Sequence, residues 1–277
     1  MYDILCNRGT VHMLIFLQYV LLKINSLNVE FQSEHFRLHR LYLMVTSEYK
    51  NIMSCFIKDE LMTNTKLSEI DPCLEINHKH IDDLYLGGRS MTRLIKQPLD
   101  NETITRRFKS DCLKFLVELC NQIRKRFPFG EDGVIAKLKV LDPKIAHDLT
   151  QSPSSIISLA VHFPSIVPEH ALNDLDDEWR SFRLSADKLP TSSESIPEYW
   201  YKLSCIKDGL NNSKYSLLSD LMTNLTILPH SSACVERIFS LMNCVKTKST
   251  NSLKTETVKD RLLAKQTITR NNMECTT

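Results

Sequence analysis

The chain of 277 residues contains few of the residues that interrupt regular structure, with 6 glycines and 10 prolines. Folds rich in β-structure need glycine and proline for their many turns, so this scarcity argues against such a fold. No long run alternates polar and apolar residues. The segment from Val134 to Leu141 fits a strand best, and a helix nearly as well. We therefore expect a mainly α-helical protein.

The chain also lacks the short motifs that mark common catalytic sites. It contains no Gly-x-Gly-x-x-Gly sequence, no P-loop and no Gly-x-Ser-x-Gly sequence, so it has neither a glycine-rich phosphate loop nor a nucleophile elbow. Its 9 cysteines are irregularly spaced and form no Cys-x-x-Cys pair. This spacing argues against a disulfide scaffold or a zinc module and favours a reducing compartment.

His78 and His80 flank Lys79 ahead of two aspartates. Because no cysteine or third ligand lies at a suitable spacing, we interpret this segment as a solvated loop rather than a metal site. We expect no metal or other cofactor.

An apolar stretch from Val11 to Leu22 raises the question of a membrane segment. The stretch is about a dozen residues long and includes His12 and Gln18, whereas a transmembrane helix needs about 20 residues. We interpret it as a buried amphipathic helix and expect no membrane partner.

Periodicity predicts long helices in the first part of the chain. Apolar residues recur at helical spacing at Leu14, Leu17, Leu21, Ile24 and Leu27. Further helices are expected over 34–59 and 101–126, with a break over 71–88. Prolines divide residues 127–195 into short helices, and a linker is expected over 190–195. The final helices are expected from residue 196 and over 214–225, 230–245 and 254–267.

Charge is unevenly distributed along the second half of the chain. Residues 166–198 contain eight acids and three bases, and residues 237–270 contain eight bases and two acids. We expect these segments to differ in their partners.

The most distinctive segment runs from Leu228 to Leu253 and reads LPHSSACVERIFSLMNCVKTKSTNSL. Pro229 and the serines after His230 predict the start of a helix. Glu236 then falls near the first turn, where the helix dipole favours an acid. From periodicity alone, Glu236 is better explained as a first-turn acid than as a catalytic group.

This segment resembles the C-terminal dimerisation region of hAT-superfamily transposases. That region has a Ser-Ala-x-x-Glu-Arg-x-Phe-Ser core, matched from Ser232 to Ser240, and a Lys-x-Lys…Asn-x-Leu tail, matched from Lys246 to Leu253. Weaker similarities lie at 27–32 and 198–200. The resemblance implies an insertion-type helical region at 11–190 and a dimerisation domain at 196–270. The latter would resemble the last elements of an RNase H-like fold. It also implies a nuclear location; residues 1–10 remain unassigned.

In that family the glutamate of the core completes an Asp-Asp-Glu triad whose carboxylates hold two metal ions. Both family aspartates precede the helical insertion, and only about ten residues precede the similar part here. The candidate aspartates are Asp82, Asp83 and those of a predicted acidic loop at 174–177. None of them follows a run of β-branched residues that would predict a core strand. The family's BED-type zinc finger has no match either. We therefore expect Glu236 to be the remnant of an inactive triad.

The resemblance implies association with a second copy or with a related hAT-type protein. The expected interface residues are Trp200, Leu203, Ala233, Ile238, Phe239, Met242, Val245, Leu253 and Leu262. One alternative is a DNA-binding regulator that contacts phosphates through Lys246, Lys248 and Lys254. A second is a transposase-like nuclease that uses Glu236, and a third is a truncated, non-functional product.

Overall fold

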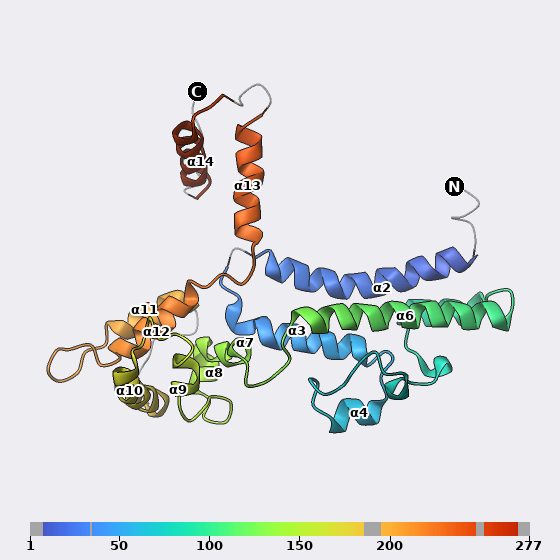
Figure 1. Ribbon diagram of the computed structural model, residues 1–277, viewed down its shortest axis with the longest axis horizontal. Coiled ribbons are helices and arrows are strands. Elements are labelled where there is room, and N and C mark those ends of the chain that lie inside the picture. The colour runs from blue at the N-terminus through green and yellow to red at the C-terminus, as the bar shows by residue number, and fades with distance from the viewer. Residues whose placement is uncertain (1–7, 34, 186–194, 248–251, 271–277) are drawn as a thin grey trace. The chain divides into compact units, whose positions relative to one another are not determined.

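The computed structural model describes residues 8–33, 35–185, 195–247 and 252–270, and these residues form a mainly helical protein (Figure 1). No sheet occurs among them, and the strand-like pairings are two isolated bridges. The expected fold class is confirmed. The elements are α2 (Arg8–Phe31), α3 (Leu38–Met53), α4 (Asp59–Asn64), η1 (Glu75–Asn77), η2 (Ile81–Asp83), α5 (Gly88–Lys96), α6 (Glu102–Arg126), α7 (Val134–Lys137), η3 (Leu138–Leu141), α8 (Pro143–His147), α9 (Ile157–Ala160), η4 (Glu169–Ala171), α10 (Leu172–Leu184), α11 (Ile196–Ser204), α12 (Ser216–Thr226), α13 (Ala233–Val245) and α14 (Thr255–Arg270).

The chain divides into two compact units. The larger unit comprises residues 1–30 and 36–228, and the smaller unit comprises residues 31–35 and 229–277. The sequence-based division at 190–196 differs from this one. Helices α11 and α12 pack against each other, and α12 packs against α10, so all three helices belong to the larger unit.

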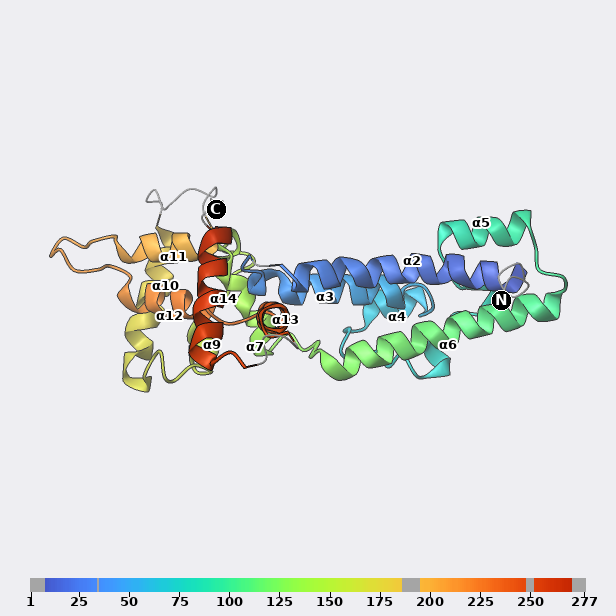
Figure 2. The same cartoon turned by 90° about the horizontal axis from the view of Figure 1, so that it is seen from above.

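Three long helices, α2, α3 and α6, form one half of the larger unit. Helices α2 and α6 run side by side in the same direction (Figures 1 and 2). The ring of His12 meets Phe108 at a centroid distance of 6.0 Å, and Phe16 meets Phe115 at 5.9 Å. Asn101 caps α6 by accepting a hydrogen bond from the Ile104 N–H at 2.8 Å.

The apolar series predicted from Leu14 to Leu27 agrees only in part with the side that α2 buries, since Leu27 is buried and Leu17 and Ile24 are half-buried. The residues that α2 buries are His12, Phe16, Val20 and Leu27. Of the predicted face, Leu14 and Leu21 are 51% and 53% exposed. The helix is apolar on almost every side, so hydrophobic period alone does not determine which side faces the core.

Length and composition would allow α2, at 24 residues, to cross a membrane, and it is the one such helix in the part of the chain that the structure describes. A core helix passes the same test. The ring contacts with α6 and the close approach of Gly87 to the ring of Tyr19 pack α2 against its own chain.

The segment from Val134 to Leu141 is helical, as α7 followed by η3, so the strand alternative is wrong. Ala136, Leu138 and Val140 are buried at every second position, a spacing that resembles a strand. Leu141 is also buried. The pattern therefore arises from a tight helical turn that is enclosed on several sides.

Aromatic residues join the helices in the other half of the larger unit. The ring of Phe182 lies 5.8 Å from that of Trp179, 5.5 Å from that of Trp200 and 6.1 Å from that of Tyr215. Both indoles are satisfied, because Trp179 donates to the Pro153 carbonyl at 3.0 Å and Trp200 donates to the Leu141 carbonyl at 2.9 Å.

The predicted acidic loop at 174–177 is wrong, because these residues lie in α10. Asp176 is 5% exposed; it accepts a hydrogen bond from the Ile156 N–H at 3.0 Å and pairs with Arg180 at 2.9 Å. Glu178 accepts from the Leu218 N–H at 2.8 Å, and burial raises the pKa of its carboxyl group. The acids of α10 thus satisfy free N–H groups at the starts of α9 and α12.

We predict that Trp200→Ala lowers the free energy of unfolding by about 3–5 kcal/mol, because it leaves a cavity in the core. The matched control is Tyr201→Ala. Tyr201 is 65% exposed, so this substitution should lower the free energy of unfolding by less than about 0.5 kcal/mol. Urea unfolding followed by far-UV circular dichroism measures both changes. Equal losses for the two variants would contradict the core position of Trp200.

Stability should decrease between neutral and acidic pH because of His39. Its side chain is buried and stacks on Phe36, and burial lowers its pKa from 6.5 to about 4. The unfolded chain therefore takes up a proton in this interval that the folded chain does not bind, so acid favours unfolding. His39→Gln should flatten the pH dependence of the melting temperature between pH 6.5 and pH 4. An unchanged slope would show that His39 does not cause it.

Candidate dimerisation surface

The distinctive segment begins the smaller unit and forms helix α13. The predicted helix at 230–245 is observed from Ala233 to Val245. The hydroxyl of Ser231 accepts a hydrogen bond from the Ala233 N–H at 3.3 Å and donates one to the carbonyl of Phe31. Ser231 therefore helps to start α13 and joins it to residues 31–35 of the same unit.

Arg237 makes a second connection within the smaller unit. Its Nη1 atom donates to the carbonyl oxygen of Gln32 at 2.7 Å, although the two residues are 205 positions apart in the sequence. In the sequence, Arg237 is notable only as part of the family resemblance. No sequence signal identified its partner, because a backbone carbonyl leaves no mark on residue type.

Glu236 lies in the first turn of α13 and is exposed. One of its carboxylate oxygens accepts a hydrogen bond from the hydroxyl of Ser232 at 2.6 Å. No group of three His, Cys, Asp or Glu side chains suited to a metal ion occurs within the described ranges. Asp82, Asp83 and the acids of α10 all belong to the larger unit.

Helices α13 and α14 pack against each other, but they cover only part of their apolar surface. Val258 of α14 is 7% exposed, and Leu241, Met242 and Val245 of α13 are half-buried. Val258 is the one buried apolar side chain among the described residues of the smaller unit. The two helices alone therefore lack a closed core.

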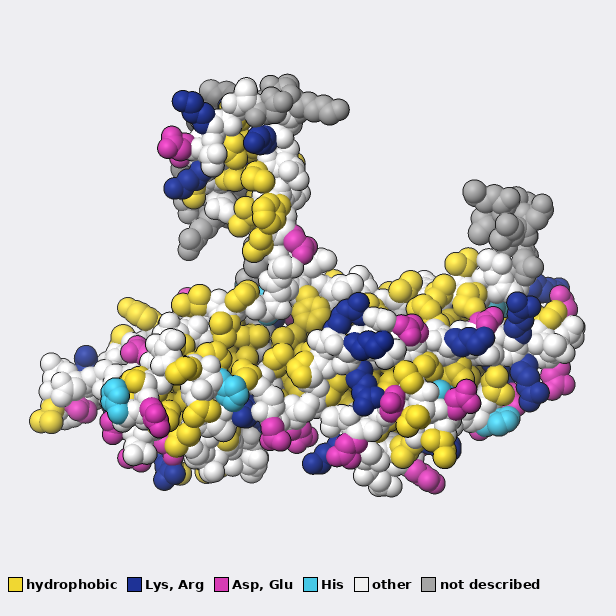
Figure 3. All heavy atoms as spheres, viewed as in Figure 1, with side chains coloured by type: hydrophobic (Ala, Val, Ile, Leu, Met, Phe, Trp, Pro, Cys, Tyr) yellow, Lys and Arg dark blue, Asp and Glu magenta, His cyan; other side chains and the backbone are white. Residues whose placement is uncertain are grey.

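A stripe of apolar residues remains exposed on α13. Val235 is 52%, Ile238 42% and Phe239 54% exposed, and Leu263 of α14 is 49% exposed. Figure 3 shows hydrophobic side chains gathered on the surface of these two helices. Residues three and four positions apart share one side of a helix, so Val235, Ile238 and Phe239 form a continuous apolar surface.

The predicted interface residues fall into three groups. Ile238 and Phe239 lie on the exposed stripe, whereas Trp200 and Leu203 are fully buried within the larger unit. The remaining five are half-buried in the smaller unit: Ala233, Met242, Val245, Leu253 and Leu262. Val235 and Leu263 were not predicted, although the helical spacing of Val235 relative to Ile238 and Phe239 was a usable signal.

Two of the three lysines predicted to contact nucleic acid are exposed in the smaller unit. These are Lys246, directly after α13, and Lys254, directly before α14. Lys248 lies outside the described residues.

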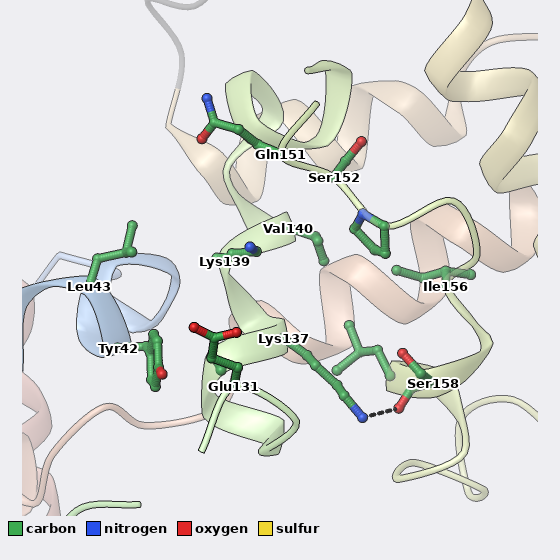
Figure 4. A pocket seen from close by; sticks show the side chains of 13 residues that line it. Tyr42, Leu43, Glu131, Lys137, Lys139, Val140, Gln151, Ser152, Ile156 and Ser158 are labelled. Atoms are coloured by element: carbon green, nitrogen blue, oxygen red, sulfur yellow. Dashed lines mark hydrogen bonds between the residues drawn. The ribbon is translucent and has the colours of Figure 1, made fainter. Parts of the chain in front are cut away.

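A separate cavity of about 450 Å³ lies within the larger unit, between α3, η3 and the segment around α9 (Figure 4). Its floor is apolar and includes Val140 and Ile156, and the Lys137 ammonium group on its edge donates to the Ser158 carbonyl at 3.0 Å. None of the predicted site residues lines this cavity.

Residues 180–268 match the model of the hAT family C-terminal dimerisation region. The match begins within α10 and ends within α14, so it includes parts of both units. No catalytic domain is identified in the chain. No curated protein and no solved structure gives a significant match to it.

We predict that Glu236→Gln slightly weakens the start of α13, by about 0.3–1 kcal/mol, because it removes a first-turn charge. Hydrogen exchange of the α13 amides measures this loss, and Glu256→Gln in the first turn of α14 is the matched control. Added Mn²⁺ should not change the hydrogen exchange of the α13 amides in the original chain or in the Glu236→Gln variant. A metal-dependent protection that Glu236→Gln removes would instead support a metal site at Glu236.

Proposed function

Because the chain carries the hAT family C-terminal dimerisation region at residues 180–268, we propose that it is a transposase-derived module that forms a homodimer through α13 and α14. The dimerisation region itself implies self-association. The proposal adds the surface on which the two copies meet, and its main support is the exposed apolar stripe of Val235, Ile238 and Phe239.

The described helices of the smaller unit lack a closed core of their own. Isolated helices of 13 and 16 residues are marginally stable in water unless an apolar face is covered. Val258 is the one buried apolar side chain among the described residues of this unit. Cover for Phe239 and its neighbours must come from elsewhere, and a second copy brings an identical apolar stripe.

A two-fold arrangement suits such a stripe. In a two-fold dimer the same surface patch of each copy meets its counterpart, so an apolar stripe is paired with an apolar stripe. Phe239 is the most exposed member of the stripe, and it is the type of large side chain that contributes most to an interface. Trp200 and Leu203 are not part of this surface, because both lie in the core of the larger unit.

We further propose that the module does not catalyse strand transfer or hydrolysis. Two-metal catalysis of phosphodiester chemistry needs several carboxylates around the ions. Glu236 is an exposed acid that accepts a hydrogen bond from Ser232, and no group of three His, Cys, Asp or Glu side chains suited to a metal ion includes it among the described residues. A nuclear location follows from the family resemblance.

A DNA-binding regulator is the second candidate function, and the exposed positions of Lys246 and Lys254 favour it. Phosphate contacts release bound counterions, so affinity for duplex DNA should then decrease steeply as salt rises. Binding that survives high salt, or no binding at all, would exclude contacts of this kind.

We predict that Phe239→Asp converts the dimer into monomers, because it places a charge at the centre of an apolar interface. The dimer dissociation constant should increase at least about 30-fold, which corresponds to roughly 2 kcal/mol for an interface hot spot. Sedimentation velocity over a concentration series measures the change.

The matched control is Leu210→Asp in the larger unit. Leu210 is 83% exposed, so this variant introduces the same charge at an exposed apolar position that belongs to the other unit. It should dimerise like the original chain. If Phe239→Asp remains a dimer, or if both variants dissociate equally, the proposed surface is not the interface.

A further inference from the structure

Helix α5 in the larger unit carries positive charge without compensating acids. The segment from Leu84 to Leu99 contains three bases and no Asp or Glu. The bases are Arg89, Arg93 and Lys96, spaced four and three residues apart, so they share one side of α5. Like charges at this spacing destabilise a helix, and their concentration on one side therefore needs an explanation.

These bases line a cavity of about 380 Å³ between α5 and α2. Figure 2 shows α5 alongside α2. The lining consists of Ile15 from α2 together with Gly88, Arg89, Thr92, Arg93, Lys96 and Gln97. It contains three cationic side chains, a hydroxyl and an amide, and no carboxylate. The cavity is thus suited to an anion.

The three bases have no carboxylate partner among the residues that the structure describes. Arg89 donates from Nη1 to Oε1 of Gln18 at 3.1 Å, which is a neutral acceptor. The Nε atom of Arg93 is buried and has no hydrogen-bond partner. By contrast, Lys109 pairs with Asp82 at 2.7 Å and Arg124 pairs with Asp71 at 3.1 Å, so these two bases of the larger unit are neutralised within the chain.

Stabilisation of the helix dipole does not account for the cluster. Arg93 and Lys96 lie in the last turn of α5, where positive charge is favourable. Arg89 is the second residue of the helix, where positive charge is unfavourable. The same first turn has no side-chain cap, so its N–H groups add to the positive potential at Gly88.

We propose that the α5 cavity binds a phosphate group, held by Arg89, Arg93 and Lys96 with a hydrogen bond from Thr92. Guanidinium groups match the geometry of phosphate oxygens and form paired hydrogen bonds with them. The phosphate has two sources with the same chemistry, free inorganic phosphate and the phosphate ester of a small organic molecule. The cavity volume lies within the range of small-molecule sites.

The test is isothermal titration of the full chain with inorganic phosphate and, separately, with a nucleoside monophosphate, at constant ionic strength set by chloride. The double variant Arg93→Gln/Lys96→Gln should bind each probe at least about tenfold more weakly, because it loses charge-assisted hydrogen bonds. The matched control is Lys125→Gln/Lys144→Gln, which removes the same charge from exposed positions on α6 and α8 and should bind normally.

A second variant, Thr92→Glu, keeps the proposal testable if the double variant does not fold. It places a carboxylate among the three bases, so it should abolish binding and raise the melting temperature in the absence of phosphate. Tighter binding of the monophosphate identifies an ester as the ligand, and equal binding identifies free phosphate. The proposal is overturned if the original chain binds neither probe, or if the control weakens binding as much as the α5 variants.

Discussion

The contact on which the larger unit depends most is the packing of Phe182 against its aromatic neighbours. The ring of Phe182 lies within 4.2 Å of His147 by centroid distance, and it also meets Trp179, Trp200 and Tyr215. These residues come from four separate parts of the chain, so one cluster fixes α8, α10, α11 and the start of α12. This half of the larger unit is therefore held together by its own side chains.

The smaller unit follows a different physical principle. The family-matched region at 180–268 starts in α10, beside Phe182, and continues to α14. Its first half is thus packed into the larger unit, and its second half forms two helices with an exposed apolar stripe. The two halves therefore differ in how their apolar side chains are covered, since only those of the first half lie in a closed core.

The apolar period predicted α6 well, and at α13 the serines before the helix also predicted where it starts. It did not predict which side of α2 faces the core, because a helix that is apolar on almost every side has no single apolar face. It also could not separate core from interface at Trp200, since both environments require large apolar side chains. The bond from Arg237 to Gln32 spans 205 positions, and only the folded chain brings these residues together.

If α13 and α14 carry a self-association surface, the full chain is a dimer. Light scattering after size exclusion, over a wide range of concentrations, measures the molar mass without assumptions about shape. A mass near twice 32.0 kDa that decreases toward that of one chain only on strong dilution is the expected result. A mass of one chain at every concentration would contradict self-association through α13 and α14.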